Sequence, residues 1–196
     1  KWTSSKRVCI ESSASSILLR AAAKRFQSVE RLRCDSLVEA QQLQIAQMTE
    51  KASSLRCLDF GVRSALKRDS LDAFASSLQK SDSLRRLQQL RLAVYCYRPV
   101  ESDFFVGLAS LRLTALCIYV LNASEDNCKA FCEALKSLVP TLRFLEVDCQ
   151  SIDAITTMRK SFEQQCQLRT FIFRRPLRSE LDAQSFCNVI ERMPQL

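Results

Sequence analysis

The residues of this chain that could do chemistry are its cysteines, its paired acids and its basic clusters, because none of its 196 residues is a histidine. Histidine is both the commonest general base and the commonest metal ligand in proteins. The two glycines, Gly61 and Gly107, lie far apart, so the sequence has no glycine-rich loop of the kind that cradles phosphate groups. We therefore expect no enzymatic activity, no catalytic residue, no cofactor and no small-molecule substrate.

Two of the ten cysteines have the spacing of half a metal site. Cys128 and Cys132 are four residues apart, which places both thiols on one face of a helix. The sequence has no second pair at metal-ligand spacing, and Phe131 and Leu135 continue the same helix face. This pattern is typical of core packing, so we expect the chain to bind no metal.

Most of the cysteines occupy positions where the pattern requires an apolar residue. Buried free thiols indicate a reducing compartment, so we expect a cytoplasmic protein rather than a disulfide scaffold. Cys57 and Cys117 are different because they fall between the apolar positions. For these two, a small inert contact and a reactive thiol are both open interpretations. We predict that four thiols are buried and unpaired: Cys34, Cys128, Cys132 and Cys187.

The charged residues favour caps and solvated surface over catalysis. Acidic pairs such as Glu125-Asp126, or Asp148 with Asp153, are typical of helix starts and turns. Residues 1–98 contain 18 basic and 9 acidic residues, whereas residues 99–196 contain 11 and 12. An acidic partner would therefore meet the first half of the chain. The aromatic interleaving of single-strand-binding proteins is absent, which argues against nucleic acid as that partner.

The elements that would position these residues follow from an internal repeat. One phrase recurs, in which an apolar residue is followed by two variable residues, an apolar one, a variable one and an apolar one. A weaker copy lies around Val8 and Ile10. The full copies are Val29-Leu32-Cys34, Leu55-Leu58-Phe60, Leu87-Leu90-Leu92, Leu113-Leu116-Ile118, Leu142-Leu145-Val147 and Leu168-Phe171-Phe173. Because the phase is nearly constant, the pattern indicates stacked structural repeats.

Each repeat has the pattern of a strand followed by a helix. The phrase ends in strict alternation, which is the period of a strand with one buried face. Apolar residues then recur at helical spacing, and Ser102, Ser124 and Ser179 are candidate helix caps. The predicted strands are 56–60, 88–92, 114–118, 143–147 and 169–173, all parallel neighbours, and the predicted helices lie around 70–80, 124–138 and 179–192.

The sequences of residues 55–60 (Leu-Arg-Cys-Leu-Asp-Phe) and 142–147 (Leu-Arg-Phe-Leu-Glu-Val) resemble leucine-rich repeats. The repeat length of about 28 residues is similar to that of the ribonuclease-inhibitor-like subclass. The resemblance covers roughly residues 5–196 and implies an α/β solenoid, a right-handed β-α superhelix with parallel strands on its concave face and helices on its convex face. The family usually has Asn or Cys three residues after the phrase, where this chain has Leu37, Arg63, Tyr95, Leu121, Gln150 and Pro176.

We interpret residues 1–196 as one leucine-rich-repeat domain of about seven repeats. The first residue is not Met, and Leu196 stands where a further repeat would begin, so we expect the chain to be a fragment of a longer one. No apolar run approaches the roughly 18 residues that span a bilayer, so we expect no membrane insertion.

The alternation also predicts a binding surface, because residues that flank the middle apolar position of each phrase point away from the core. Large apolar side chains on an exposed sheet favour a bound partner. We expect Tyr119 and Phe144 to form one patch with Arg91 and Ile172, and their truncation to leave the fold nearly intact. The predicted partner-binding residues are Arg33, Asp59, Arg91, Tyr119, Phe144, Glu146, Ile172 and Arg174.

The sequence therefore predicts a non-catalytic protein–protein interaction module, a scaffold or a subunit of a larger assembly. Two alternatives stay open. Repeats of this subclass also form the Ran GTPase-activating protein, so the resemblance alone allows a regulator of a small GTPase. The basic first half allows a nucleic-acid-binding surface, whose affinity would fall steeply with salt.

Overall fold

The computed structural model describes residues 7–10, 26–35, 38–49, 52–61, 66, 68–82, 84–95, 102–121, 124–149, 162, 167–174 and 180–191. The strands are β1 (Arg7–Ile10), β2 (Arg31–Cys34), β3 (Cys57–Phe60), β4 (Gln89–Tyr95), β5 (Ala115–Leu121), β6 (Phe144–Cys149) and β7 (Thr170–Phe173). The α-helices are α2 (Glu39–Thr49), α3 (Arg68–Lys80), α4 (Ser102–Ala109), α5 (Glu125–Leu138) and α7 (Glu180–Ile190), and the 3-10 turns are η1 (Phe26–Ser28) and η3 (Leu84–Arg86).

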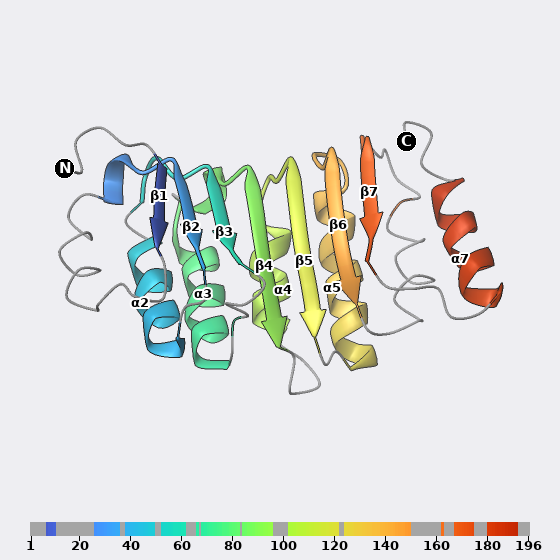
Figure 1. The fold of residues 1–196 in the computed structure, drawn as a ribbon, viewed down its shortest axis with the longest axis horizontal. Helices are drawn as coiled ribbons and strands as arrows, with labels where there is room; N and C mark the ends of the chain where they lie inside the picture. Colours follow the sequence, from blue (N-terminus) through green and yellow to red (C-terminus); the bar gives the residue numbers. More distant parts are fainter. Residues whose placement is uncertain are drawn as a thin grey trace.

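The strands form one seven-stranded sheet in which every pair of neighbours is parallel. Their order in the sheet is their order in the sequence, β1 to β7. The predicted parallel strands are confirmed, and each starts one residue after its predicted start. The protein is therefore a mixed α/β structure with an all-parallel sheet (Figure 1).

The register of the sheet aligns the apolar phrases of all the strands. The middle apolar residues share one register position, and all of them except Phe171 are buried. Because each apolar side chain packs on its counterpart in the next strand, the core is continuous along the sheet. These residues are Val8, Leu32, Leu58, Leu90, Leu116, Leu145 and Phe171.

Helices α2 to α5 all lie on one face of the sheet (Figure 1). Each packs against the next one along the chain. A series of aromatic contacts runs from the sheet through these helices. The ring centroids of Phe60 and Phe74 are 5.7 Å apart, and those of Phe105 and Phe131 are 5.9 Å apart. A Cβ atom on Gly107 would lie 3.0 Å from Cβ of Leu78, so glycine lets α4 approach α3 closely.

The predicted helices are confirmed as α3, α5 and α7, and α2 and α4 are additional. The sequence of α2 lacks the apolar periodicity that predicts a helix, because the polar residues Gln41 and Gln42 occupy two of its buried positions. The Ser124 cap is also confirmed, since its Oγ accepts a hydrogen bond from the Asn127 amide at 3.2 Å. Ser102 is the first residue of α4, and Ser179 lies outside the described residues.

The prediction of buried thiols outside disulfide bonds holds for Cys34, Cys128 and Cys132. It is wrong for Cys187, which is unpaired but exposed. Helix α7 turns Phe186 toward β7, where its ring lies 5.9 Å from that of Phe171. Since the next helical residue is rotated by about 100°, Cys187 leaves that packed face. None of the described helices combines the length and the apolar character needed to cross a membrane.

Candidate functional site

The candidate site is the open face, which we define as the face of the sheet opposite helices α2 to α5 (Figure 1). Strand alternation sends one set of side chains into the core and the other onto this face. The burial pattern of β2, with Arg31 and Arg33 exposed and Leu32 and Cys34 buried, shows that alternation directly. All of the predicted partner-binding residues belong to the strand positions of the open face or, for Arg174, directly follow β7.

The middle of the open face is one register row, which we call the central row. Its members on β2 to β7 are Arg33, Asp59, Arg91, Cys117, Glu146 and Ile172. Neighbouring strands are about 4.8 Å apart, so successive side chains in the row can touch. Opposite charges alternate along its first half, and this arrangement stabilises cross-strand pairs.

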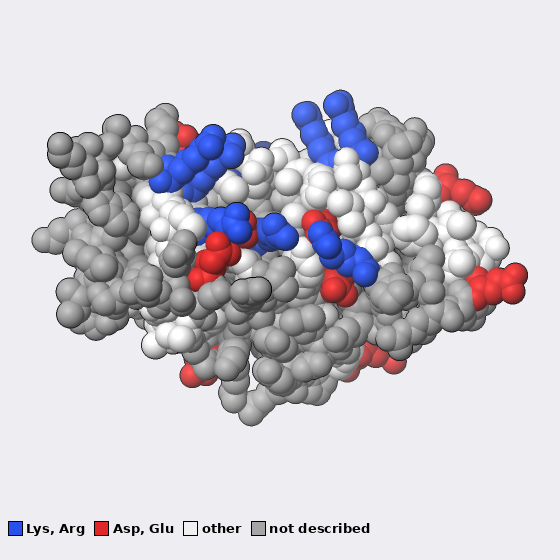
Figure 2. All heavy atoms as spheres, viewed as in Figure 1, with Lys and Arg blue, Asp and Glu red and all other residues white. Residues whose placement is uncertain are grey.

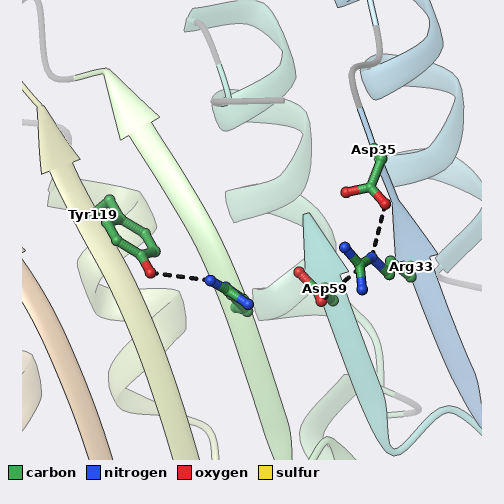
Figure 3. A network of polar contacts seen from close by, with 5 residues as sticks. Arg33, Asp35, Asp59 and Tyr119 are labelled. Atoms are coloured by element: carbon green, nitrogen blue, oxygen red, sulfur yellow. Dashed lines mark hydrogen bonds and ion pairs between the residues drawn. The ribbon is translucent and has the colours of Figure 1, made fainter. Parts of the chain in front are cut away.

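The β2 end of the central row is an exposed ion-pair cluster (Figure 3). Arg33 Nε lies 2.7 Å from an oxygen of Asp35 and 4.0 Å from an oxygen of Asp59. A Cβ atom on Gly61 would lie 2.3 Å from Asp35 Oδ1, so any other residue at position 61 would displace this carboxylate. Solvent-exposed pairs of this kind contribute only about 0–1 kcal/mol each.

The β4–β7 half holds a more buried network centred on Tyr119. The Tyr119 hydroxyl donates a hydrogen bond to Glu146. It accepts one of 3.2 Å from Arg91 (Figure 3). The Arg91 guanidinium also lies 5.9 Å from the centre of the Tyr119 ring, which is within cation–π range. Arg174 forms an ion pair with Glu146, whose side chain is 7 % exposed. Three strands and the residue after β7 are thus joined through one phenol and one carboxylate.

The network shifts the acidities of its members. Burial would raise the pKa of the Glu146 carboxyl, but the hydrogen bonds from Tyr119 and Arg174 and the charges of Arg174 and Arg91 outweigh it and lower that pKa. Burial and the bond to Glu146 raise the pKa of Tyr119. Burial and the Glu146 charge raise the pKa of Cys117 to about 12, so its thiol is protonated at neutral pH. A protonated thiol favours the interpretation of Cys117 as a small inert contact over a reactive thiol.

Two buried polar atoms at the centre of the face have no hydrogen-bond partner in the described part of the chain. They are Asp59 Oδ1 and Arg91 Nε, which belong to paired residues of neighbouring strands. Burial raises the pKa of Asp59 despite the opposing charges of Arg91 and Arg33. Leaving a buried donor or acceptor unmatched costs about 1–3 kcal/mol. The site thus offers one acceptor and one donor side by side.

The predicted patch of Tyr119 with Phe144 is wrong. Tyr119 pairs with Asp148 in the register, whereas Phe144 pairs with Ala115, four residues away along β5. Tyr119 is also only 5 % exposed, because its ring packs with Ala93 and Cys117 and its hydroxyl serves the network. Its truncation would therefore damage the fold. Ile172, at 36 % exposure, is the large apolar residue that the central row does present.

A group of basic residues, of which sequence reasoning placed only Arg31 on the concave face, lies at the N-terminal ends of the strands. The backbone amide of Arg169 bonds to the Arg143 carbonyl at 2.8 Å, so these two arginines occupy equivalent positions on neighbouring strands. We define the arginine rim as Arg56, Arg143 and Arg169, which share this position, together with Arg31, which lies one position further along because Glu30 holds the equivalent position before β2. Three of the four precede the alternating part of their phrase, which is why alternation did not place them on the face. Their recurrence directly before the strand was the available signal.

Among the described residues, no group of three or more His, Cys, Asp or Glu side chains could hold a metal ion. Asp153, which the sequence paired with Asp148, lies outside those residues. In comparisons with known proteins, no family model matches this sequence and no curated protein is significantly similar to it.

Proposed function

We propose that this chain is a leucine-rich-repeat solenoid of the ribonuclease-inhibitor-like type whose open face binds another protein, without catalysis. The seven parallel strands in sequence order support the repeat assignment, because stacked strand-plus-helix units of this kind produce that order. The aligned apolar row from Val8 to Phe171 supports it as well, since each repeat supplies one member.

The observation that carries the binding proposal is the unmatched pair at the centre of the open face. Asp59 Oδ1 requires a donor and Arg91 Nε requires an acceptor. Both residues are partly exposed, so a rotation of each side chain brings these atoms to the surface of the open face. A peptide group of a partner then supplies both, an N–H for the carboxylate and a carbonyl for the guanidinium. The surrounding network stabilises these side chains in position before a partner arrives, which reduces the entropy cost of association.

Site-specific photo-crosslinking tests this proposal with two matched positions. Ile172 on the open face and Val106 on α4 are both exposed branched aliphatic residues, at 36 % and 61 % exposure. A photoreactive benzoylphenylalanine at Ile172 should give a discrete protein adduct in extracts of the native cells, and the same group at Val106 should not. The adduct should disappear in an Asp59→Asn background, since that change removes the charged acceptor. Equal adducts from both positions, or none from either, would refute the proposal.

A further inference from the structure

We infer that the arginine rim holds an extended segment of the partner protein that carries two acidic pairs separated by a short neutral stretch. This inference rests on the proposed function and adds the chemistry of the partner. The rim divides into two basic ends, Arg31 with Arg56 at β2–β3 and Arg143 with Arg169 at β6–β7. Between them, at β4 and β5, the equivalent positions are the uncharged Gln88 and Thr114.

The rim arginines have no carboxylate partner among the described residues. No Asp or Glu in the described part of the chain forms an ion pair with Arg31, Arg56, Arg143 or Arg169. Arg56 reaches two carbonyl oxygens, those of Leu55 and Arg86, each at 3.5 Å. One acidic residue, Glu30, lies beside Arg56 at the β2 end, where its backbone carbonyl accepts a hydrogen bond from the Arg56 amide.

Arg143 and Arg169 are the stronger end of the site. Both are exposed, and their backbones are joined by hydrogen bonds between neighbouring strands. Like charges opposite each other on adjacent strands are destabilising, and an anion between them relieves that repulsion. Arginine presents a planar fork that matches a carboxylate with two parallel hydrogen bonds. Figure 2 shows basic side chains gathered at the upper edge over β1–β3 and again over β5–β7, with uncharged atoms between.

The spacing of the two basic ends sets the length of the segment. Four strand intervals separate the middle of the β2–β3 pair from the middle of the β6–β7 pair. At about 4.8 Å per interval this is roughly 19 Å, which about six residues of extended chain would span. The partner segment should therefore place its acidic pairs about six residues apart, centre to centre, with neutral residues between them.

A protein segment fits this face better than a nucleic acid. A phosphodiester chain carries a negative charge on every nucleotide, so it would also load the neutral stretch at Gln88 and Thr114. Where it crossed the face it would meet Asp35, Asp59 and Asp148. A peptide can limit its acidic residues to the two ends.

The test compares two labelled peptides of identical composition by fluorescence anisotropy at low ionic strength. The split peptide is Glu-Glu-Ser-Ser-Ser-Ser-Glu-Glu, and the clustered peptide is Ser-Ser-Glu-Glu-Glu-Glu-Ser-Ser. We expect the split peptide to bind at least fivefold more tightly, and Arg143→Gln/Arg169→Gln to abolish this preference. The control Lys80→Gln/Lys129→Gln removes the same charge from the helices and should leave the preference intact. A thymidine octanucleotide should bind no more tightly than the split peptide.

Equal binding of the two peptides would overturn the inference, as would an equal effect of the rim and helix variants. Tighter binding of the oligonucleotide, lost in the rim variant, would assign the rim to nucleic acid instead and also overturn it. The photo-crosslinking experiment at Ile172 tests the proposed function independently. If Arg143→Gln/Arg169→Gln keeps that adduct, the partner binds the open face without the rim, and only the inference fails.

Discussion

The central row crosses the middle of the open face, and the arginine rim lies at the N-terminal ends of the same strands, about three residues away along the chain; both are rich in arginine. In the central row, Arg33 and Glu146 form ion pairs, the latter with Arg174, and Arg91 donates a hydrogen bond to the Tyr119 hydroxyl. In the rim, Arg143 and Arg169 are exposed side by side with no described acid next to them. The comparison shows that arginine content alone does not define a binding surface. What distinguishes the two regions is whether the protein itself neutralises the charge.

From this difference we expect the central row and the arginine rim to contribute to different properties of the protein. The central row should contribute to stability and fix the shape of the face around its unmatched pair, Asp59 and Arg91, because most of its charges are partly buried and mutually paired. The rim should contribute to partner affinity and little to stability, because exposed unpaired charges contribute almost nothing to the folded state. The substitutions below test that division, from the largest expected change in stability to the smallest.

The largest effect is expected for Tyr119→Ala. The change removes a nearly buried ring and leaves Glu146 and Arg91 without their shared hydroxyl, so the free energy of unfolding should fall by about 3 kcal/mol. Phe144→Ala, on the same face but outside the network, should cost less than about 1 kcal/mol. Urea denaturation of the two variants measures both values. Equal losses would show that the network adds nothing to burial alone.

Glu146→Gln should lower the free energy of unfolding by about 2 kcal/mol at pH 7, since hydrogen bonds to a charged group are lost. Folding lowers the pKa of Glu146, so the stability it contributes is fully present above its ordinary value of 4.5 and is lost as the pH falls through the lowered value. The difference from the unsubstituted protein should therefore shrink below pH 4.5. Glu133→Gln, at an exposed pair with Lys136, is the matched control and should change stability by less than about 0.5 kcal/mol.

Asp59→Asn should leave the free energy of unfolding unchanged or raise it by up to about 1 kcal/mol at pH 7. Folding raises the pKa of Asp59 above 3.8, so its charge opposes folding once the pH rises through that value. The variant and the unsubstituted protein should therefore converge in stability below pH 3.8. Asp35→Asn, which removes the closer partner of Arg33, should instead cost about 0–1 kcal/mol. A clear loss for Asp59→Asn would mean that its ion pair outweighs its burial.

The smallest effect on stability is expected for Arg143→Gln/Arg169→Gln, within about 0.5 kcal/mol of the unsubstituted protein. Relief of repulsion between the two neighbouring guanidinium groups makes a slight gain the expected sign. Thermal unfolding followed by circular dichroism measures it. A loss comparable to that of Glu146→Gln would place these arginines in the structural network and remove the contrast between the two rows.

Much of the fold followed from the sequence because its signal is periodic and local. The recurring phrase specified the strands from residue 55 onward and their phase, and Ser124 marked the start of α5. The exceptions have local causes. Gln41 and Gln42 on buried positions conceal α2, and the helical turn after Phe186 carries Cys187 outward. Alternation also placed Arg33, Asp59 and Glu146 on the correct face.

The register between strands was decided only by the tertiary structure, and the site depends on it. Alternation tells which face a side chain occupies but not which residue of the next strand lies beside it. The sheet pairs Tyr119 with Asp148 rather than with Phe144, and it lets Tyr119 reach Glu146 and Arg91. Burial of a polar group is favourable only when a partner is within hydrogen-bond distance, and such partners here come from repeats about 28 residues apart. The sequence therefore determined the faces, while packing determined which polar groups are satisfied and which remain unmatched among the described residues.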